Sequence, residues 1–316
     1  MLSRTAESLF WTSRNMERAD TIARKLEMGY RMSMMPTQSG GMASEWQSIL
    51  AATGELEKFQ QHYDEENQDN VEHFLVYSSE NPSSIKQCIR AARNNARQVR
   101  TAITSDVWSA LNQAYLEFQA FEVQGGTKPD LPSLCDWTKR QAATVRGAFS
   151  NTQLHQDGAD FFNLGYFVER AGNTARMLDI KYHVLLPTIE TVGGAVDNYQ
   201  WTTLLRAFSS HRAFHWAYGG DYSPDKIAHF LILNQACPRS LKYCLGQTNQ
   251  HLDRLSQGYG AYSPAQLHAM RMRDDLATAS VGDIIQNGLH EFLIQFTIEN
   301  NQLAEKIADS FLFGER

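Results

Sequence analysis

The sequence predicts an all-α protein, a helical bundle built from two tandem-duplicated helical halves related by a pseudo-twofold axis. Long stretches carry apolar residues at i, i+3 and i+4, and strand-like alternation is absent. One charged helical sequence also occurs in two similar copies, SLFWTSRNMERADTIARKLEM at 8–28 and DFFNLGYFVERAGNTARMLDI at 160–180. The offset is 152 residues, from Glu17 to Glu169. A solenoid repeats every ~20–50 residues, so this longer period favours two copies packed face to face.

The repeat divides the chain into a first helical half at 1–150 and a second at 151–316, which we expect to pack as one domain. Each half should open with a long helix, at about 3–35 and about 157–186. A second helix should begin near Trp46 and, in the other half, near Tyr199. The turn-forming stretch GGTKPDLPS marks the weakest boundary, near residues 125–135.

A short apolar helix should follow in each half, at about 70–78 and about 224–234. The later of these has Ser223 as a good N-cap, with proline at the first helical position. The stretch HFLVYSSENPSSIKQCI at 73–89 then matches HFLILNQACPRSLKYCL at 229–245, and in each a proline should lie in the first turn of another long helix. These prolines are Pro82 and Pro238.

The chain should end in one helix over about 281–312. A broad apolar face along it predicts that this helix packs on the bundle. The face consists of Ile284, Ile285, Leu289, Phe292, Phe296 and Ile298.

The composition is that of a soluble globular protein, with 42% hydrophobic and 20% charged residues. No apolar run reaches the ~18 residues that a membrane span needs, and the N-terminus does not read as a signal peptide. The net charge of −6 argues against nucleic acid as the main partner. The four cysteines form no paired motif, so we expect a reducing, cytoplasmic compartment and neither zinc nor a disulfide framework.

The repeated helix places an acid and a base seven residues apart in each half, on one stripe of the helix. Apolar neighbours flank these charges, which suggests that they are buried and therefore paired. The helices could cross near the pseudo-axis, with each glutamate paired to an arginine of the other half, as a structural ion cluster. The same residues could instead line a cleft that holds a charged ligand, since arginine binds carboxylate and phosphate in bidentate fashion. The candidate cluster is Glu17, Arg18, Arg24, Glu169, Arg170 and Arg176.

A second feature occurs in the first half only. In IRAARNNARQVR, four arginines share one helix face, and the matching stretch of the second half lacks them until Arg254. This face could be solvated, or paired with the acidic run 64–66. It could equally be a docking face for an acidic partner or substrate. Its members are Arg90, Arg93, Arg97 and Arg100.

Independent catalytic signatures are missing. No glutamate lies three residues before a histidine, so the Glu-x-x-His pattern of di-iron bundles is absent. His211 and His215 are four apart, but no His-Glu-x-x-His motif surrounds them. No phosphate loop, nucleophile elbow or Cys–His arrangement is present either. We therefore expect no metal site, and no catalytic residue can be assigned.

These motifs together resemble the bacterial alpha-E family, all-helical proteins named for a Glu-Arg motif. MERADTIARKLE, FVERAGNTARMLD, SSENPSSIKQCIRAARNNARQVR, VWSALNQAYLEF and GLHEFL carry the resemblance, which runs nearly end to end. The Glu-Arg motif falls on Glu17-Arg18 and Glu169-Arg170. Asn95 is a departure, because the family's arginine-rich pattern would have an acid near this position.

The resemblance implies a partner. Family members are encoded beside, or fused to, a circularly permuted ATP-grasp protein, often near a transglutaminase-like peptidase. ATP-grasp enzymes join a carboxylate to an amine through an acyl phosphate, so the chain is expected to be a helical partner in peptide or amide-bond formation. ATP and Mg are expected on that partner, with no cofactor on this chain. The alternatives are an independent enzyme that uses Glu17 and Glu169 as an acid–base pair, and a scaffold with structural ion pairs.

Overall fold

The computed structural model describes residues 1–34, 45–123, 128–183 and 195–314, and within these ranges the chain is helical without a strand. The helices of the first half are α1 (Ser3–Ser33), α2 (Glu45–Thr53), α3 (Leu56–Gln60), α4 (Gln68–Glu72), a π-helical turn (His73–Tyr77), α5 (Ile85–Gln98), α6 (Ser105–Glu122) and α7 (Leu131–Thr152). Those of the second half are α8 (Asp157–His183), α9 (Ala195–Ala207), α10 (His211–Tyr218), α11 (Pro224–Ile232), α12 (Leu241–Tyr259), α13 (Pro264–Thr278), α14 (Val281–Asn287) and α15 (Leu289–Ser310).

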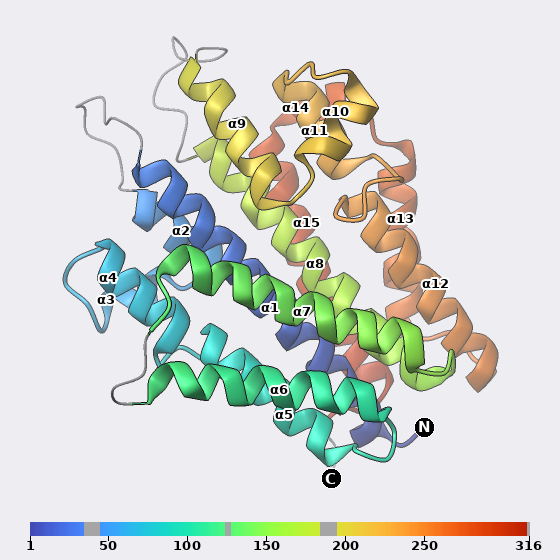
Figure 1. The fold of residues 1–316 in the computed structure, drawn as a ribbon. Coiled ribbons are helices and arrows are strands. Elements are labelled where there is room, and N and C mark those ends of the chain that lie inside the picture. The colour runs from blue at the N-terminus through green and yellow to red at the C-terminus, as the bar shows by residue number, and fades with distance from the viewer. Residues whose placement is uncertain (35–44, 124–127, 184–194, 315–316) are drawn as a thin grey trace.

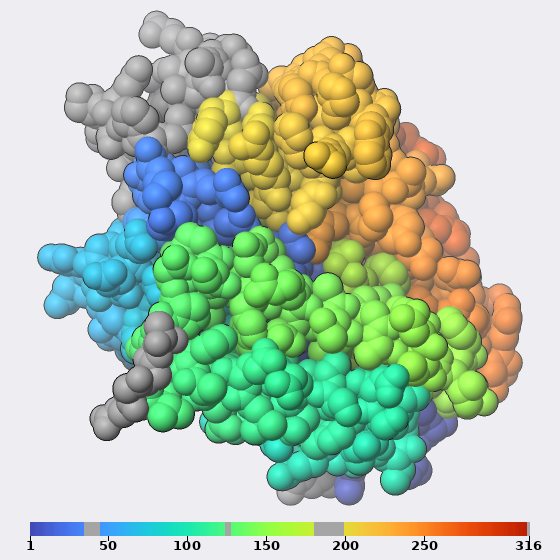
Figure 2. Space-filling model, in the orientation of Figure 1, coloured from blue at the N-terminus to red at the C-terminus, as the bar shows by residue number. Residues whose placement is uncertain are grey.

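The long helices α1 and α8 lie side by side through the middle of the molecule (Figure 1). The α1 helix also packs on α5 and α7, and α8 packs on α12 and α15. On the face shown in Figure 2, α6 and α7 cover much of α1. Both central helices are therefore screened from solvent on several sides, including at polar positions.

A glycine permits the close approach of the two central helices. A Cβ atom added at Gly165 of α8 would lie 2.1 Å from the backbone oxygen of Phe10 in α1. Ser13, one turn further along α1, donates its hydroxyl to the backbone oxygen of Phe162. The backbones thus touch directly, and the side chains near the contact are forced into the interior.

Two apolar clusters fill the interior. One contains residues of both halves, from Ala6 to Ile307. The other lies within the first half, from Ala19 on α1 to Trp137 on α7. Because the larger cluster joins the halves, the α1–α8 region is an internal part of one core.

Several predicted boundaries are confirmed. The long helices begin at Ser3 and Asp157, and their expected ends near 35 and 186 fall beyond the described residues. The second helix begins at Glu45, next to the expected Trp46, but in the other half it begins at Ala195, four residues before Tyr199. Ser223 occupies the N-cap position of α11, as predicted, but its side chain makes no capping hydrogen bond.

Other predicted boundaries are wrong. The helices after Pro82 and Pro238 begin at Ile85 and Leu241, because Ser84 and Ser240 accept backbone hydrogen bonds as N-caps and leave the prolines outside. The short helix expected at 70–78 is α4 followed by the π-helical turn.

The single C-terminal helix expected at 281–312 is also wrong. It is broken into α14 and α15 by Gly288, whose φ of 106° does not fit a helix. Of the expected apolar face, Ile284, Leu289 and Phe296 are buried, whereas Ile285 and Ile298 are exposed.

Candidate functional site

The predicted charged residues gather where α1 and α8 cross. On one side, Arg18 makes a two-pronged contact with Glu169, with Nε 2.8 Å from Oε1 and Nη2 3.0 Å from Oε2. Arg14 adds a third hydrogen bond, from its Nε to Oε2 of Glu169 at 2.6 Å. Glu169 is buried, and both oxygens of its carboxylate accept hydrogen bonds from these two guanidinium groups.

The other side of the crossing holds the reciprocal pair. Arg170 contacts Glu17 with Nε 2.7 Å from Oε1 and Nη2 3.0 Å from Oε2. Arg239, from the loop before α12, reaches both Glu17 at 3.3 Å and Asp20 at 2.9 Å. Each Glu-Arg pair of one half thus interlocks with the pair of the other half.

The remaining two arginines of the predicted cluster have different partners. Arg24 donates to Asp20 at 2.7 Å, and also to the backbone oxygen of Ala207 and the hydroxyl of Ser209. Arg176 donates to the side-chain oxygen of Asn173 at 2.9 Å, and no ion pair of it is present within the described residues. Because Arg24 and Arg176 share a helix stripe with Glu17 and Glu169, the sequence predicted that these arginines are buried. The two glutamates pair instead with Arg170 and Arg18, each the arginine that follows the equivalent glutamate in the opposite half.

Burial and charge pull against each other at these groups. Burial by itself raises the pKa of the Glu169 carboxyl, but Arg18 and Arg14 outweigh it and hold that pKa far below its usual range. At Asp20, burial by itself also raises the pKa of the carboxyl, but Arg24 and Arg239 outweigh burial and lower that pKa to about 2. Both acids are therefore ionised at neutral pH, and the crossing is held by charge-assisted hydrogen bonds.

A pocket of about 200 Å³ opens beside Glu169, between α1, α8 and the segments around Thr53 and Ser83. We call it the Glu169 pocket. Its charged lining, among the described residues, consists of Arg14, Arg18, Lys25, Glu55, Glu169 and Arg176. Four cationic side chains therefore face two carboxylates, and the pocket favours an anion.

Lys25 lies deep in this pocket and is 2% exposed. Its ammonium group donates to the backbone oxygen of Ala52 at 2.7 Å. Burial, and then the charge of Arg176, lower the pKa of Lys25 well below its usual value. Burial also lowers the pKa of Arg176, which Glu169 only partly offsets. An incoming anion would stabilise both cations, since an opposite charge favours the charged form of each.

The arginine face of α5 is split between packing and exposure. Arg93 donates to Asn112 at 2.9 Å and stacks over Tyr115. Arg100 lies over the Trp108 ring, but it is exposed and lies beyond the end of α5 at Gln98, so it does not belong to the predicted helix face. Arg90 and Arg97 are exposed. None of the four forms an ion pair within the described chain, so the expected pairing with the acidic run 64–66 is not present there.

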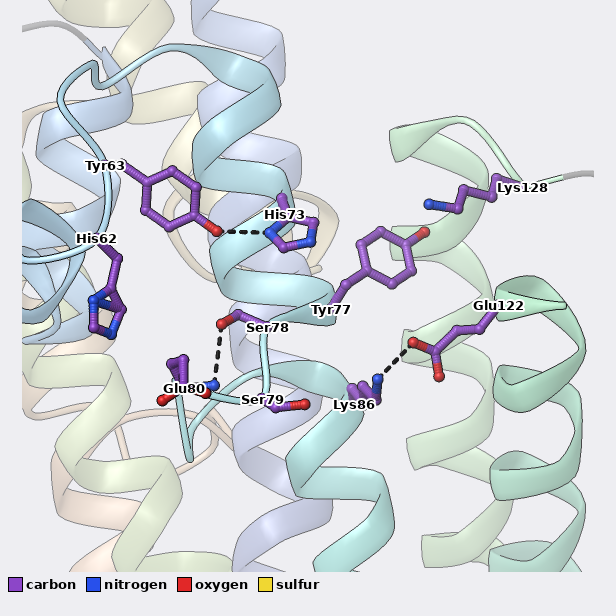
Figure 3. A pocket seen from close by; sticks show the side chains of 10 residues that line it. All are labelled: His62, Tyr63, His73, Tyr77, Ser78, Ser79, Glu80, Lys86, Glu122 and Lys128. Carbon is purple, nitrogen blue, oxygen red and sulfur yellow. Dashed lines mark hydrogen bonds and ion pairs between the residues drawn. The ribbon is translucent and has the colours of Figure 1, made fainter. Parts of the chain in front are cut away.

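A second hollow of about 620 Å³ lies at the π-helical turn and was not predicted from the sequence (Figure 3). Tyr63 and His73 share a hydrogen bond of 2.6 Å on one wall. The Tyr77 ring points the other way, toward the end of α6 and the start of α7, and carries the Lys128 ammonium 4.8 Å from its centre. Two lysines and two glutamates balance each other in this groove, so its charge favours neither an anion nor a cation.

Three contributors to the crossing were missed by the sequence reasoning: Arg14, Asp20 and Arg239. Arg14 had a signal, because it lies one turn before Arg18 on the same helix face. Arg239 lies in a loop and contacts residues more than 200 positions away, which no local pattern indicates. Among the described residues, no cluster of three or more His, Cys, Asp or Glu side chains suits a metal ion. None of the described helices has the length and apolar character to cross a membrane.

The fold and site define an all-helical protein whose two longest described helices cross through interlocked Glu-Arg pairs, with a cationic pocket on one side of the crossing. The chain belongs to the Alpha-E family, whose model, described as a predicted alpha-helical domain with a conserved ER motif, matches residues 1–312. Among curated proteins and solved structures, none matches the chain.

Proposed function

We propose that this chain is the helical subunit of an ATP-grasp-type peptide or amide ligase and that it holds a charged amino-acid or peptide substrate in the Glu169 pocket. The observation that carries the proposal is Arg176, a largely buried guanidinium that lines the pocket without an acidic partner in the described chain. Guanidinium groups in such places are suited to bidentate carboxylate binding. Glu169 itself is occupied by Arg14 and Arg18, so its role is to hold the pocket wall in place.

The proposal assigns docking of the ATP-grasp protein to the arginine face of α5. Arg90 and Arg97 are exposed and unpaired there, which suits an acidic surface on the partner. ATP and Mg would be bound by that partner and not by this chain. A transglutaminase-like peptidase would act in the same pathway. Four buried free cysteines support a cytoplasmic location.

We also propose that the two halves arose by duplication and are related by a pseudo-twofold axis. Matched contacts support this: Phe59 stacks on Tyr63 with ring centres 4.9 Å apart, as Phe214 does on Tyr218. Asn173 donates to Thr21, the residue 152 positions earlier, as expected of equivalent residues that face each other at an axis.

A scaffold function is the second candidate, because Glu17 and Asp20 are paired with arginines of this chain, as structural ion pairs would be. An independent acid–base enzyme is disfavoured, since Glu17 and Glu169 are each committed to two arginines.

The test is co-purification with the ATP-grasp protein encoded beside this chain, followed by ATP turnover with amino-acid and peptide mixtures. We expect a stable complex whose turnover depends on this chain. Arg176→Met should abolish the dependence while the complex still forms, and Arg90→Glu with Arg97→Glu should dissociate it. Turnover that is the same with and without this chain would leave only the scaffold function.

A further inference from the structure

The two sides of the crossing differ in how much space they leave. A pocket of about 200 Å³ opens beside Glu169. The Glu17 side is filled by Arg239, whose guanidinium lies between Glu17 and Asp20. The same register that aligns 73–89 with 229–245 places Ser83 at the position of Arg239. Ser83 lines the Glu169 pocket, and its short side chain leaves that guanidinium position open.

An acid is missing from the Glu169 side as well. The offset of 152 residues places Gly172 at the position of Asp20, and Arg176 at the position of Arg24. Arg24 has the carboxylate of Asp20 at 2.7 Å. Among the described residues, the hydrogen-bond acceptor of Arg176 is the amide oxygen of Asn173 at 2.9 Å. At these two matched positions, the Glu169 side therefore has neither the carboxylate of Asp20 nor the guanidinium of Arg239.

The pocket contains an acceptor for that missing cationic group. Glu55 lines the pocket and is 8% exposed. Its Oε2 atom forms an ion pair of 3.4 Å with Lys58, whose side chain is 51% exposed to solvent. An ion pair with so exposed a partner contributes little to stability, so an ammonium group that enters the pocket would replace Lys58 at Glu55 at little cost.

We propose that the Glu169 pocket binds a free α-amino acid as a zwitterion, with its carboxylate on Arg176 and its ammonium group on Glu55. This proposal rests on the proposed function and names its substrate class. The ligand would supply in one molecule the two charges that Asp20 and Arg239 supply on the filled side. A pocket of about 200 Å³ suits a ligand of the size of one amino acid.

Ligand chemistry provides the first test. Each of the twenty L-amino acids would be titrated into the full chain by calorimetry, and the best binder compared with its N-acetyl and its amide derivative. We expect binding of the amino acid and at least tenfold weaker binding of both derivatives. Equal binding of the N-acetyl derivative would overturn the assignment of the ammonium group, while a carboxylate-binding subunit would stand. Failure of all twenty amino acids to bind would overturn the inference, and the assay with the ATP-grasp protein would then test the proposed function separately.

Variants provide the second test. Ser83→Arg places at the open position the side chain that the other half has there, so it should fill the pocket and weaken amino-acid binding at least tenfold while the far-UV circular dichroism is unchanged. Ser79→Arg is the matched control, because Ser79 is exposed on the same loop and lines the other groove. Glu55→Gln should weaken binding of the amino acid but not of its N-acetyl derivative. Unchanged affinity in Ser83→Arg would refute the pocket as the site.

Discussion

At the scale of single residues, the crossing of α1 and α8 depends on acids that are buried with their counterions. Burying a carboxylate is costly unless good geometry and several hydrogen bonds compensate. Glu169 meets this condition with three hydrogen bonds from two arginines. The arrangement can therefore be stable as a set and still be sensitive to the loss of any one member.

Glu169→Gln should lower the free energy of unfolding by about 3–5 kcal/mol, because it leaves Arg14 and Arg18 without a counterion in a buried place. Urea unfolding monitored by circular dichroism would measure this. Glu122→Gln is the control, since Glu122 pairs with Lys86 where both side chains are more than a quarter exposed. That change should cost less than about 1 kcal/mol. An unchanged free energy of unfolding in Glu169→Gln would contradict a structural role for the cluster.

Lys25→Met should raise the free energy of unfolding by roughly 1–4 kcal/mol at neutral pH, the gain seen when buried ionic groups give way to apolar ones. The second half has Met177 at the matching position, fully buried. Because burial lowers the pKa of Lys25 in the folded protein below the value of 10.5 in the unfolded chain, the gain should shrink as pH rises toward 10.5. Unfolding curves at pH 7 and pH 10 would show this. A gain independent of pH would mean that folding does not lower the pKa of Lys25.

At the scale of elements, hydrophobic periodicity located the long helices well but not the interruptions. Gly288 breaks the last helix because it adopts a positive φ, and a single glycine in a helical pattern does not reveal whether it will do so. The partners of Glu17 and Glu169 were predictable only as arginines of the opposite half. Which arginine meets which acid depends on the rotation of α1 against α8, and that rotation follows from the contact at Gly165, which is not a local property of the sequence.

Gly165→Ala should destabilise the protein strongly, because the new Cβ would meet the backbone oxygen of Phe10 and the helices would have to separate. Gly147→Ala is the matched helical control, since no atom lies within 4 Å of a Cβ added there. That substitution should stabilise the protein by up to about 1 kcal/mol through helix propensity. Thermal unfolding of the two variants would show shifts of opposite sign. Similar shifts would argue against a tight α1–α8 contact.

At the scale of the whole molecule, the buried acids link stability to pH. Asp20 has a pKa lowered from 3.8 to about 2, so its contribution is present above pH 3.8 and is lost as pH falls toward 2. Glu169 acts in the same direction from 4.5 downward. The free energy of unfolding should therefore fall between pH 5 and pH 2, with about 2 kcal/mol from Asp20 alone. Urea unfolding at pH 7, 5 and 3 would measure the fall, and Asp20→Asn should flatten it. An equally steep fall in Asp20→Asn would assign the acid sensitivity elsewhere.

The interlocked pairs have a consequence for any attempt to divide the chain. Each half contributes an acid whose counterion belongs to the other, so either half alone would carry stranded charges on an apolar surface. If the chain were cut between α7 and α8, the two fragments should misfold apart and regain helical order when mixed. The charged pairs of the crossing would then determine that each fragment binds the other. If each fragment were fused to a different protein, reassembly of the fold would report that these two proteins interact.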